Sequence, residues 1–277
     1  MKTDKIIKAA VIGWPINHSK SPLIHGYWLA KAGILGSYEA IGIAPESFNA
    51  GISNLVLQGY AGCNVTIPHK ETALNKADSV SDRAQAIGAA NTLVFKDGKI
   101  FADNTDGIGF INNLKQGAPD WRASAGTALV LGAGGAARAI VYALLQDGAP
   151  KVLIANRTLE KAKILSDFFG DKVGVVSINE VPDALGEVHT FVNTTALGMT
   201  GQPELIIDIS SLPKTALVTD IVYNPLTTDL LKQAQGLGLI TVDGLGMLLH
   251  QAVPGFEAWF GVRPVVDVEL RQKVLAG

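Results

Sequence analysis

A glycine-rich turn carries the clearest chemical signal in this sequence. The apolar run Thr127–Leu131 is followed by Gly132-Ala-Gly-Gly-Ala-Ala and then by a helical pattern. Glycines at this spacing permit a tight turn and let a pyrophosphate approach the start of a helix closely. A strand–helix turn without a ligand would need similar glycines, but apolar strands on both sides favour dinucleotide binding by Gly132, Gly134 and Gly135.

The next apolar run, Lys151–Ala155, ends where the ribose of a dinucleotide would lie. NAD enzymes usually place Asp or Glu there to bind the ribose hydroxyls. This chain offers only Glu160, which we expect inside a helix capped by Thr158 and pointing away. A guanidinium can bind a phosphate dianion through paired hydrogen bonds. We therefore predict NADP rather than NAD. The alternative is that the cations Arg157 and Lys161 are merely solvated at a helix start. The residues expected to hold NADP are Asn156, Arg157, Thr158 and Lys161.

Polar residues in the first third of the chain could form a second site. Ser19 and Ser21 follow the first apolar run, and Pro22 suits the first turn of a helix, so Ser21 fits the N-cap position. The same geometry would also direct hydroxyl and amide groups at an anion. Taken alone, Lys70 fits a solvated lysine, and Asp106 fits a first-turn acid stabilised by the helix dipole.

Composition excludes several other classes of protein. The 277 residues are 48% hydrophobic and 17% charged, which argues against disorder. The net charge is −2 and no basic run occurs, which argues against a nucleic-acid partner. A single cysteine, Cys63, and five histidines without ligand spacing indicate no internal disulfide and no metal. Without a signal peptide or a membrane-spanning run, we predict a soluble cytoplasmic protein with no membrane partner.

The elements that position these residues alternate between β-type and helix-type segments. This alternation predicts an α/β fold, with mostly parallel sheets covered by helices on both faces. Asp97-Gly98 predicts a hairpin and therefore an antiparallel edge. The expected strands are Ala9–Ile12, Tyr38–Ile43, Cys63–Thr66, Thr92–Phe95, Ile100–Ala102, Ala128–Leu131, Val152–Ala155, Val173–Val176, Thr190–Val192, Ala216–Thr219 and Leu239–Val242.

The length predicts two domains, at roughly 150 residues per domain. We place the boundary near residue 106 and regard Gln116–Gly126 as the best linker candidate. The last thirty residues have helical spacing. They could close the second domain, or they could return to the first domain and set the active cleft between the two.

Several short motifs follow one another along the chain. The most specific are Asn64-Val-Thr-Ile-Pro-His-Lys70 and Asn104-Thr-Asp-Gly107. The other motifs are Ile16-Asn-His-Ser-Lys-Ser-Pro22, Ala89-Ala-Asn-Thr92, Gly132-Ala-Gly-Gly135, Asn156-Arg-Thr158, Tyr223-Asn-Pro225 and Gly246-Met-Leu-Leu-His-Gln251. With these motifs in this order, the chain resembles shikimate dehydrogenase, the reductase of 3-dehydroshikimate, over essentially its whole length. One departure is Gly26, where the family usually has Asn after the histidine.

The resemblance implies a discontinuous substrate-binding domain, 1–106 plus 245–277, and a Rossmann-type doubly wound parallel-sheet NADP domain, 107–244. It makes Lys70 and Asp106 the catalytic pair. Tyr223 could instead only pack, and Gln251 could be an exposed helix position. The residues it assigns to the substrate are Ser19, Ser21, Thr66, Asn91, Tyr223 and Gln251, and those it adds to the cofactor site are Ala136, Gly244 and Met247.

The activity that the resemblance implies is the reversible, NADPH-dependent reduction of 3-dehydroshikimate to shikimate, which leads to chorismate and the aromatic amino acids. The expected enzyme is a monomer or a homodimer. The Lys70 ammonium can protonate the alkoxide that hydride transfer leaves, while Asp106 holds the lysine and binds a neighbouring hydroxyl.

Two alternatives remain open. One is a quinate/shikimate dehydrogenase that prefers NAD. Enzymes of that kind resemble this chain but carry an acidic residue near Asn156 and a threonine in place of one serine. Neither feature is seen here. The other is a dinucleotide-binding sensor module without catalysis. The presence of both Lys70 and Asp106 argues against that module.

Overall fold

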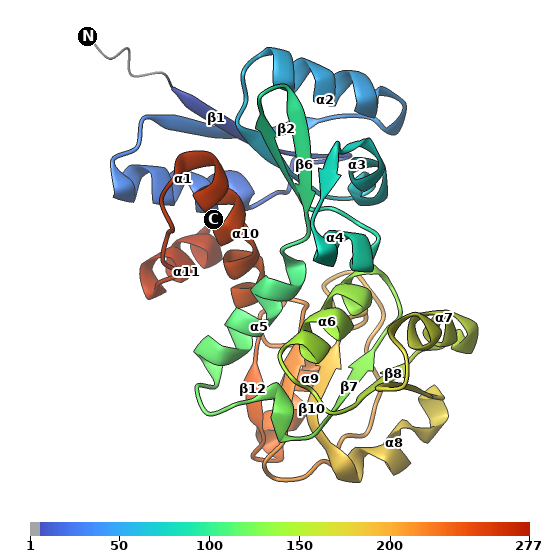
Figure 1. Ribbon diagram of the computed structural model, residues 1–277. Coiled ribbons are helices and arrows are strands. Elements are labelled where there is room, and N and C mark those ends of the chain that lie inside the picture. The colour runs from blue at the N-terminus through green and yellow to red at the C-terminus, as the bar shows by residue number, and fades with distance from the viewer. Residues whose placement is uncertain (1–5) are drawn as a thin grey trace. The chain divides into compact units, whose positions relative to one another are not determined.

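The computed structural model describes residues 6–277, which form two compact units (Figure 1). Unit 1 contains the chain up to Thr105 together with Gln251–Gly277. Unit 2 is the continuous stretch Asp106–His250.

Unit 1 is built on a mixed six-stranded sheet. In spatial order its strands are β2 (Gly36–Gly42), β1 (Ile7–Gly13), β3 (Gly62–Val65), β5 (Thr92–Lys96), β6 (Lys99–Asp103) and β4 (Ser79–Val80). Strand β1 runs parallel to β2 and β3, whereas β5 is antiparallel to both β3 and β6. The predicted hairpin at Asp97-Gly98 is confirmed, since both residues have positive φ, 51° and 73°, as a tight two-residue turn requires.

The helices of unit 1 cover this sheet. They are α1 (Ser21–Ala32), α2 (Phe48–Leu57), α3 (Lys70–Lys76), α4 (Asp82–Ile87), the second half of α10 (Leu245–Phe260) and α11 (Val268–Ala276). Buried Phe48 and Ile52 anchor α2 in the core. The C-terminal segment is tied in by hydrogen bonds from the indole of Trp259 to the Leu93 carbonyl, at 2.9 Å, and from the indole of Trp28 to the Val265 carbonyl, at 3.0 Å.

Unit 2 holds a six-stranded sheet in which every pairing is parallel. In spatial order its strands are β9 (Val173–Val176), β8 (Val152–Ala155), β7 (Thr127–Leu131), β10 (Val188–Asn193), β11 (Leu217–Asp220) and β12 (Ile240–Val242). Numbered from β7, this is the order 3-2-1-4-5-6 of a doubly wound dinucleotide-binding sheet, which confirms the predicted fold class. Its topological switch point lies between β7 and β10, where such sheets bind ligands at the carboxyl ends of the strands.

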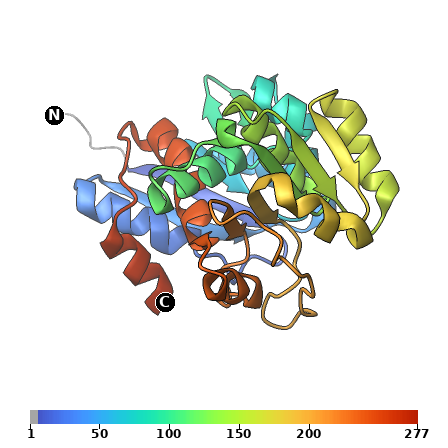
Figure 2. The same ribbon diagram turned by 90° about the horizontal axis from the view of Figure 1, so that it is seen from below.

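Helices cover both faces of this sheet (Figures 1 and 2). Alternate residues of β7 explain why: Ala128 and Val130 join one core cluster, and Leu129 and Leu131 join the other. The first cluster includes residues of α5 (Asp106–Gly117), α6 (Gly135–Gln146) and α7 (Leu159–Phe169), and the second includes residues of α8 (Val181–Ala184) and α9 (Asp229–Gly236).

Some sequence-based expectations are wrong in detail. The candidate linker Gln116–Gly126 lies inside unit 2, where Trp121 is buried and its indole donates to Thr190 Oγ1 at 2.9 Å. The two-residue strand β4 was not expected, and the helical pattern of the last thirty residues is interrupted over 261–267. Within residues 6–277, every helix is too short or too polar to cross a membrane.

Candidate active site

The glycine turn of unit 2 leaves open space in front of α6. Gly132 has φ +115°, and a Cβ there would lie 2.5 Å from Thr194 Oγ1, so the fold itself requires glycine at this position. Gly134 and Gly135 are exposed, and a Cβ on either would meet no protein atom within 4 Å. The protein therefore does not fill the space at the start of α6, which fits close approach of a cofactor pyrophosphate to the first-turn amides. Ala136, in that first turn, is half-buried.

The end of β8 presents two cations. Arg157 and Lys161 are exposed, and neither side chain has a hydrogen bond or ion pair with another residue of the described chain. Thr158 is the N-cap of α7 as predicted, but its side chain makes no capping bond. The Asn156 amide instead donates to the Thr158 carbonyl at 2.8 Å, which shapes the turn. Glu160 lies in the first turn of α7 as expected. This strand end suits a phosphate better than a ribose diol.

The other side of the switch point contains residues that the sequence did not single out. Thr194 follows β10, and its backbone N–H and hydroxyl both donate to the Leu131 carbonyl, at 2.9 and 2.7 Å. The carbonyl of Asn193 accepts from Ile221, and its side-chain amide donates to Asp220 at 3.0 Å. The ends of β7, β10 and β11 are therefore fastened to one another.

Asp220 holds the loop that carries Tyr223. It is fully buried and accepts hydrogen bonds from the Val222 N–H, at 3.0 Å, and the Thr228 hydroxyl, at 2.8 Å. Burial raises the pKa of Asp220, while these hydrogen bonds oppose that shift. Tyr223 is 39% exposed, and partial burial raises the pKa of its hydroxyl.

Two predicted cofactor residues have structural roles in unit 2. A Cβ on Gly244 would collide with the carbonyl of Ile221, so this close approach of backbones requires glycine. Met247, in α10, packs half-buried against the core cluster that includes Ala128 and Val130. Whether either touches a cofactor stays a prediction.

In unit 1, the serine loop differs from the expected helix cap. Helix α1 begins at Ser21 itself, with Lys20 in the N-cap position and no side-chain cap, so the prediction of Ser21 as N-cap is wrong by one residue. The N–H of Ser21 instead donates to Ser19 Oγ at 3.3 Å. The Ser21 hydroxyl is therefore not used to cap the helix.

Thr66 and Lys70 follow β3 directly. The Thr66 N–H continues the sheet by donating to the Ile12 carbonyl at 2.9 Å, and Lys70 is the first residue of α3. The Lys70 carbonyl accepts from Ala90 at 2.8 Å, which places this helix start beside Asn91. Lys70 is half-buried and makes interactions with its surroundings, unlike the solvated lysine that its type alone suggests.

Asn91 is the centre of a buried network. Its Oδ1 accepts from the N–H of Thr105, at 2.9 Å, and from the Thr92 hydroxyl, also at 2.9 Å, and its Nδ2 faces Gln251 Oε1 at 3.4 Å. The Thr105 hydroxyl donates to the Gln251 carbonyl at 2.8 Å. Two predicted substrate residues that are 160 positions apart, Asn91 and Gln251, are thus brought together within unit 1.

Asp106 opens α5 in unit 2, directly after Thr105. It is half-buried and interacts with neighbouring groups. The next residue, Gly107, packs against Ala139 and Ala143 of α6, where a Cβ would be 2.8 Å from the Ala143 methyl. This close packing fixes the start of the helix that carries Asp106.

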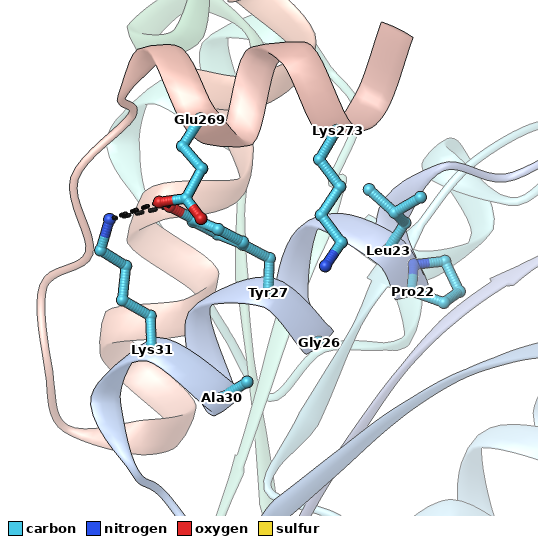
Figure 3. A pocket seen from close by; sticks show the side chains of 8 residues that line it. All are labelled: Pro22, Leu23, Gly26, Tyr27, Ala30, Lys31, Glu269 and Lys273. Atoms are coloured by element: carbon cyan, nitrogen blue, oxygen red, sulfur yellow. Dashed lines mark hydrogen bonds and ion pairs between the residues drawn. The ribbon is translucent and has the colours of Figure 1, made fainter. Parts of the chain in front are cut away.

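A separate pocket of about 550 Å³ lies between α1 and α11 (Figure 3). Lys31 forms ion pairs there with Asp267, at 2.6 Å, and Glu269, at 3.4 Å, and the Tyr27 hydroxyl donates to Glu269 at 2.8 Å. The departure from the family pattern, Gly26, faces this pocket and has no neighbour in contact with its Cβ position. None of the predicted site residues lines it, so this cluster fastens α11 to α1 rather than forming part of the site.

Three further side chains, those of Cys63, His69 and His250, are at least partly buried. Cys63 is buried, which raises the pKa of its thiol, and His69 is buried with Nε2 2.7 Å from the Ile43 carbonyl. His250 contacts Gln116 Oε1 at 3.0 Å, and partial burial lowers its pKa to about 4. Among residues 6–277, no group of three or more acidic, histidine or cysteine side chains could hold a metal.

Comparison with known proteins agrees with these observations. The families described as "Shikimate dehydrogenase substrate binding domain", "Shikimate / quinate 5-dehydrogenase" and "Shikimate 5'-dehydrogenase C-terminal domain" match residues 11–93, 115–246 and 244–268. A "Shikimate dehydrogenase (NADP(+))" from Jannaschia sp. is 54% identical over 278 residues, covering 100% of both chains.

Solved structures are similar over the same length. Shikimate 5-dehydrogenase from Thermus thermophilus, in complex with NADP(H) and shikimate, is 34% identical with a TM-score of 0.87, covering 98% of this chain and 99% of that one. Quinate dehydrogenase from Corynebacterium glutamicum, in complex with NAD, is 31% identical with a TM-score of 0.90 and the same coverage. With a doubly wound unit, an open glycine turn and full-length relatives above half identity, this chain belongs to the shikimate dehydrogenase family.

Proposed function

We propose that this protein is an NADP-dependent shikimate dehydrogenase that reversibly reduces 3-dehydroshikimate to shikimate. The observation that carries the proposal is that one chain of this family contains two sets of groups, one suited to the substrate and one suited to the cofactor. Unit 1 contains hydroxyl and amide groups suited to a small hydroxylated carboxylic acid. Unit 2 contains an open glycine turn with two unpaired cations at the end of β8.

The substrate assignments follow from the chemistry of these groups. The ring of shikimate has one carboxylate and several hydroxyls, which need a few hydrogen-bond partners rather than a deep apolar pocket. The hydroxyls of Ser19, Ser21 and Tyr223 suit the carboxylate, and Thr66, Asn91 and Gln251 suit the ring hydroxyls. The pre-arranged Asn91–Gln251 contact supports this division.

Bound NADPH supplies the hydride that reduces the ketone. The residues proposed to hold it are Gly132, Gly134, Gly135 and Ala136 in the glycine turn and the start of α6, the cluster Asn156, Arg157, Thr158 and Lys161, and Gly244 and Met247. Arg157 and Lys161 would neutralise the 2′-phosphate, and the amides at the start of α6 would bind the pyrophosphate.

Lys70 would supply the proton. As the carbonyl carbon gains a hydride, its oxygen becomes an alkoxide, and the Lys70 ammonium transfers a proton to that oxygen to give the alcohol. The neutral amine then regains a proton from solvent. In the reverse direction the amine accepts the proton of the shikimate hydroxyl. Asp106 would keep Lys70 charged and oriented and accept a hydrogen bond from an adjacent substrate hydroxyl.

The test is a nicotinamide absorbance assay with shikimate and quinate, each against NADP and NAD. We expect turnover with shikimate and NADP to exceed every other combination. Comparable turnover of quinate with NAD would favour the activity that the Corynebacterium relative's name describes. Cofactor binding without turnover in any combination would favour a sensor module. Mass measurement in solution separates a monomer from a homodimer.

A further inference from the structure

Tyr38 is a buried tyrosine that the proposed mechanism does not use. It is the third residue of β2 and is 9% exposed. Burial raises the pKa of its hydroxyl well above the ordinary value, so the hydroxyl remains protonated and donates. Its acceptor is Oδ1 of Asn64, at 2.6 Å. A short hydrogen bond between two buried side chains restricts both of them.

The hydroxyl of Tyr38 connects to Asn91 through Asn64. The Asn64 amide donates to the Asn91 carbonyl and to Thr92 Oγ1, both at 3.2 Å. The Thr92 hydroxyl in turn donates to Asn91 Oδ1 at 2.9 Å. Because Oδ1 of Asn91 is occupied from inside the protein, its Nδ2 is directed the other way, toward Gln251. The relay therefore sets which way the Asn91 amide faces.

The ring of Tyr38 connects to the serine loop through His25. The two rings stack with centroids 3.8 Å apart and an interplanar angle of 3°. His25 follows Ser21 by four residues in α1, so both side chains lie on the same face of that helix. The aromatic side chains of Trp28, Phe256 and Trp259 surround His25 with centroids within 6 Å and hold the stack in place.

We propose that Tyr38 is a positioning residue, which ties the helix that begins with Ser21 to the strands that hold Asn91, and so fixes the spacing of the two halves of the substrate site. This inference rests on the proposed function, because it needs a substrate that contacts Ser21 and Asn91. Tyr38 acts through the side chains of Asn64 and Ser21, which interact with its hydroxyl, and through the ring of His25, which stacks on its own ring.

The substitution Tyr38→Phe distinguishes the hydrogen bond to Asn64 from the stack on His25, because it removes the hydroxyl and keeps the ring. We expect the KM for shikimate to rise about three- to tenfold, the effect of one ordinary hydrogen bond. Turnover should stay within about twofold, and the KM for NADP should not change. The matched control is Tyr60→Phe, which removes another hydroxyl of unit 1, bonded to Glu39, outside this network. It should leave the KM for shikimate unchanged.

A double-mutant cycle with Asn91→Ala tests the route. If Tyr38 acts through the orientation of Asn91, Tyr38→Phe should change shikimate affinity less than about twofold once Asn91 is alanine. Affinity is measured by calorimetry where turnover is too slow. If Tyr38→Phe does not fold, Asn64→Ser breaks the same contact from the other side and also removes the two bonds that the Asn64 amide donates, so the KM should rise at least as much and the rise should again depend on Asn91.

An unchanged KM in Tyr38→Phe, or an equal rise in the presence and absence of the Asn91 amide, overturns the inference. A fall in turnover that exceeds the rise in KM would also overturn it, because positioning of bound substrate groups would then not be the role. Failure of the unmodified protein to oxidise shikimate is a different result, which counts against the proposed function instead.

Discussion

At the scale of single residues, the polar side chains of the described chain fall into two groups. Some are buried and hydrogen-bonded inside the protein, and others are exposed and make no such bond. Asn64 and Asp220 are buried and their polar atoms are bonded inside the protein. Arg157 and Lys161 are exposed and unpaired. We therefore expect substitutions in the first group to lower stability and substitutions in the second group to weaken the binding of a charged ligand.

Lys70 is expected to affect turnover rather than binding. Lys70→Ala removes the proposed proton donor, so kcat should fall about 10²- to 10⁴-fold, the usual range for a general acid. The KM for shikimate should change much less, because the lost interaction is made mainly in the transition state. Steady-state kinetics measure both constants. The control is Lys76→Ala, an exposed lysine at the other end of α3, which should be neutral. Near wild-type turnover in Lys70→Ala would remove it from the mechanism.

Arg157 is expected to determine the choice of cofactor. Its guanidinium can form charge-assisted bonds to a 2′-phosphate, each worth about 1.5–3 kcal/mol, and two of them imply a preference for NADP of roughly 10²-fold or more. Arg157→Ala should weaken NADP and leave NAD nearly unchanged, as measured by kcat/KM for each. Added salt should weaken NADP more than NAD, since the site is exposed. Lys163→Ala, an exposed cation further along α7, is the control. Equal loss for both cofactors would contradict this assignment.

At the scale of elements, the glycine turn separates stability from binding. Gly132→Ala places a Cβ at φ +115° and 2.5 Å from Thr194 Oγ1, so unit 2 should lose about 1–3 kcal/mol. Gly134→Ala meets no protein atom within 4 Å and should cost at most about 1 kcal/mol, yet it crowds the expected pyrophosphate. We expect its KM for NADP to rise roughly tenfold. Chemical denaturation and cofactor kinetics distinguish the two. A Gly134→Ala protein with unchanged NADP binding would show that no phosphate lies there.

The elements could be predicted where their signals are local. The strands of unit 2 are continuous apolar runs, because a parallel sheet buried on both faces needs them, and Val152–Ala155 and Val173–Val176 end at the predicted residues. Strand β4, with two residues, has no such run. The Gln116–Gly126 segment contains Gly and Pro but is held by the buried indole of Trp121, a contact with a residue 69 positions away. Local composition cannot show a contact of that kind.

The residues of the proposed site come from the motifs, whereas the side chains that support them could not be predicted. Motif order identified the expected ligand groups, whereas Tyr38, Asn64 and Thr105 act through hydrogen bonds between segments far apart in the chain. The same limit explains the error at Ser21. Serine followed by proline suits two adjacent positions at a helix start, and only the backbone angles of Lys20 decide between them.

At the scale of the whole molecule, each unit contains one histidine that burial keeps neutral. Burial lowers the pKa of His25 in unit 1 to about 3 and that of His250 in unit 2 to about 4. In an unfolded chain a histidine has a pKa near 6.5. Between the folded and unfolded values, the unfolded chain binds more protons. The stability of both units should therefore be independent of these histidines above about pH 6.5 and fall as the pH drops below it.

His25 makes this expectation measurable in unit 1. At pH 5 its neutral, buried state should cost about 2 kcal/mol of stability, since each pH unit below 6.5 contributes about 1.4 kcal/mol until the folded pKa is reached. Urea unfolding followed by tryptophan fluorescence reports mainly on unit 1, which contains Trp14, Trp28 and Trp259, while only Trp121 lies in unit 2. His25→Phe keeps an aromatic ring against Tyr38 and removes the proton-binding group, so its loss of stability between pH 7.5 and pH 5 should be smaller by that amount. Tyr38→Phe changes the same ring cluster but keeps His25, and it should lose as much as the unmodified protein. If all three proteins lose the same stability on acidification, His25 is not the group that senses pH.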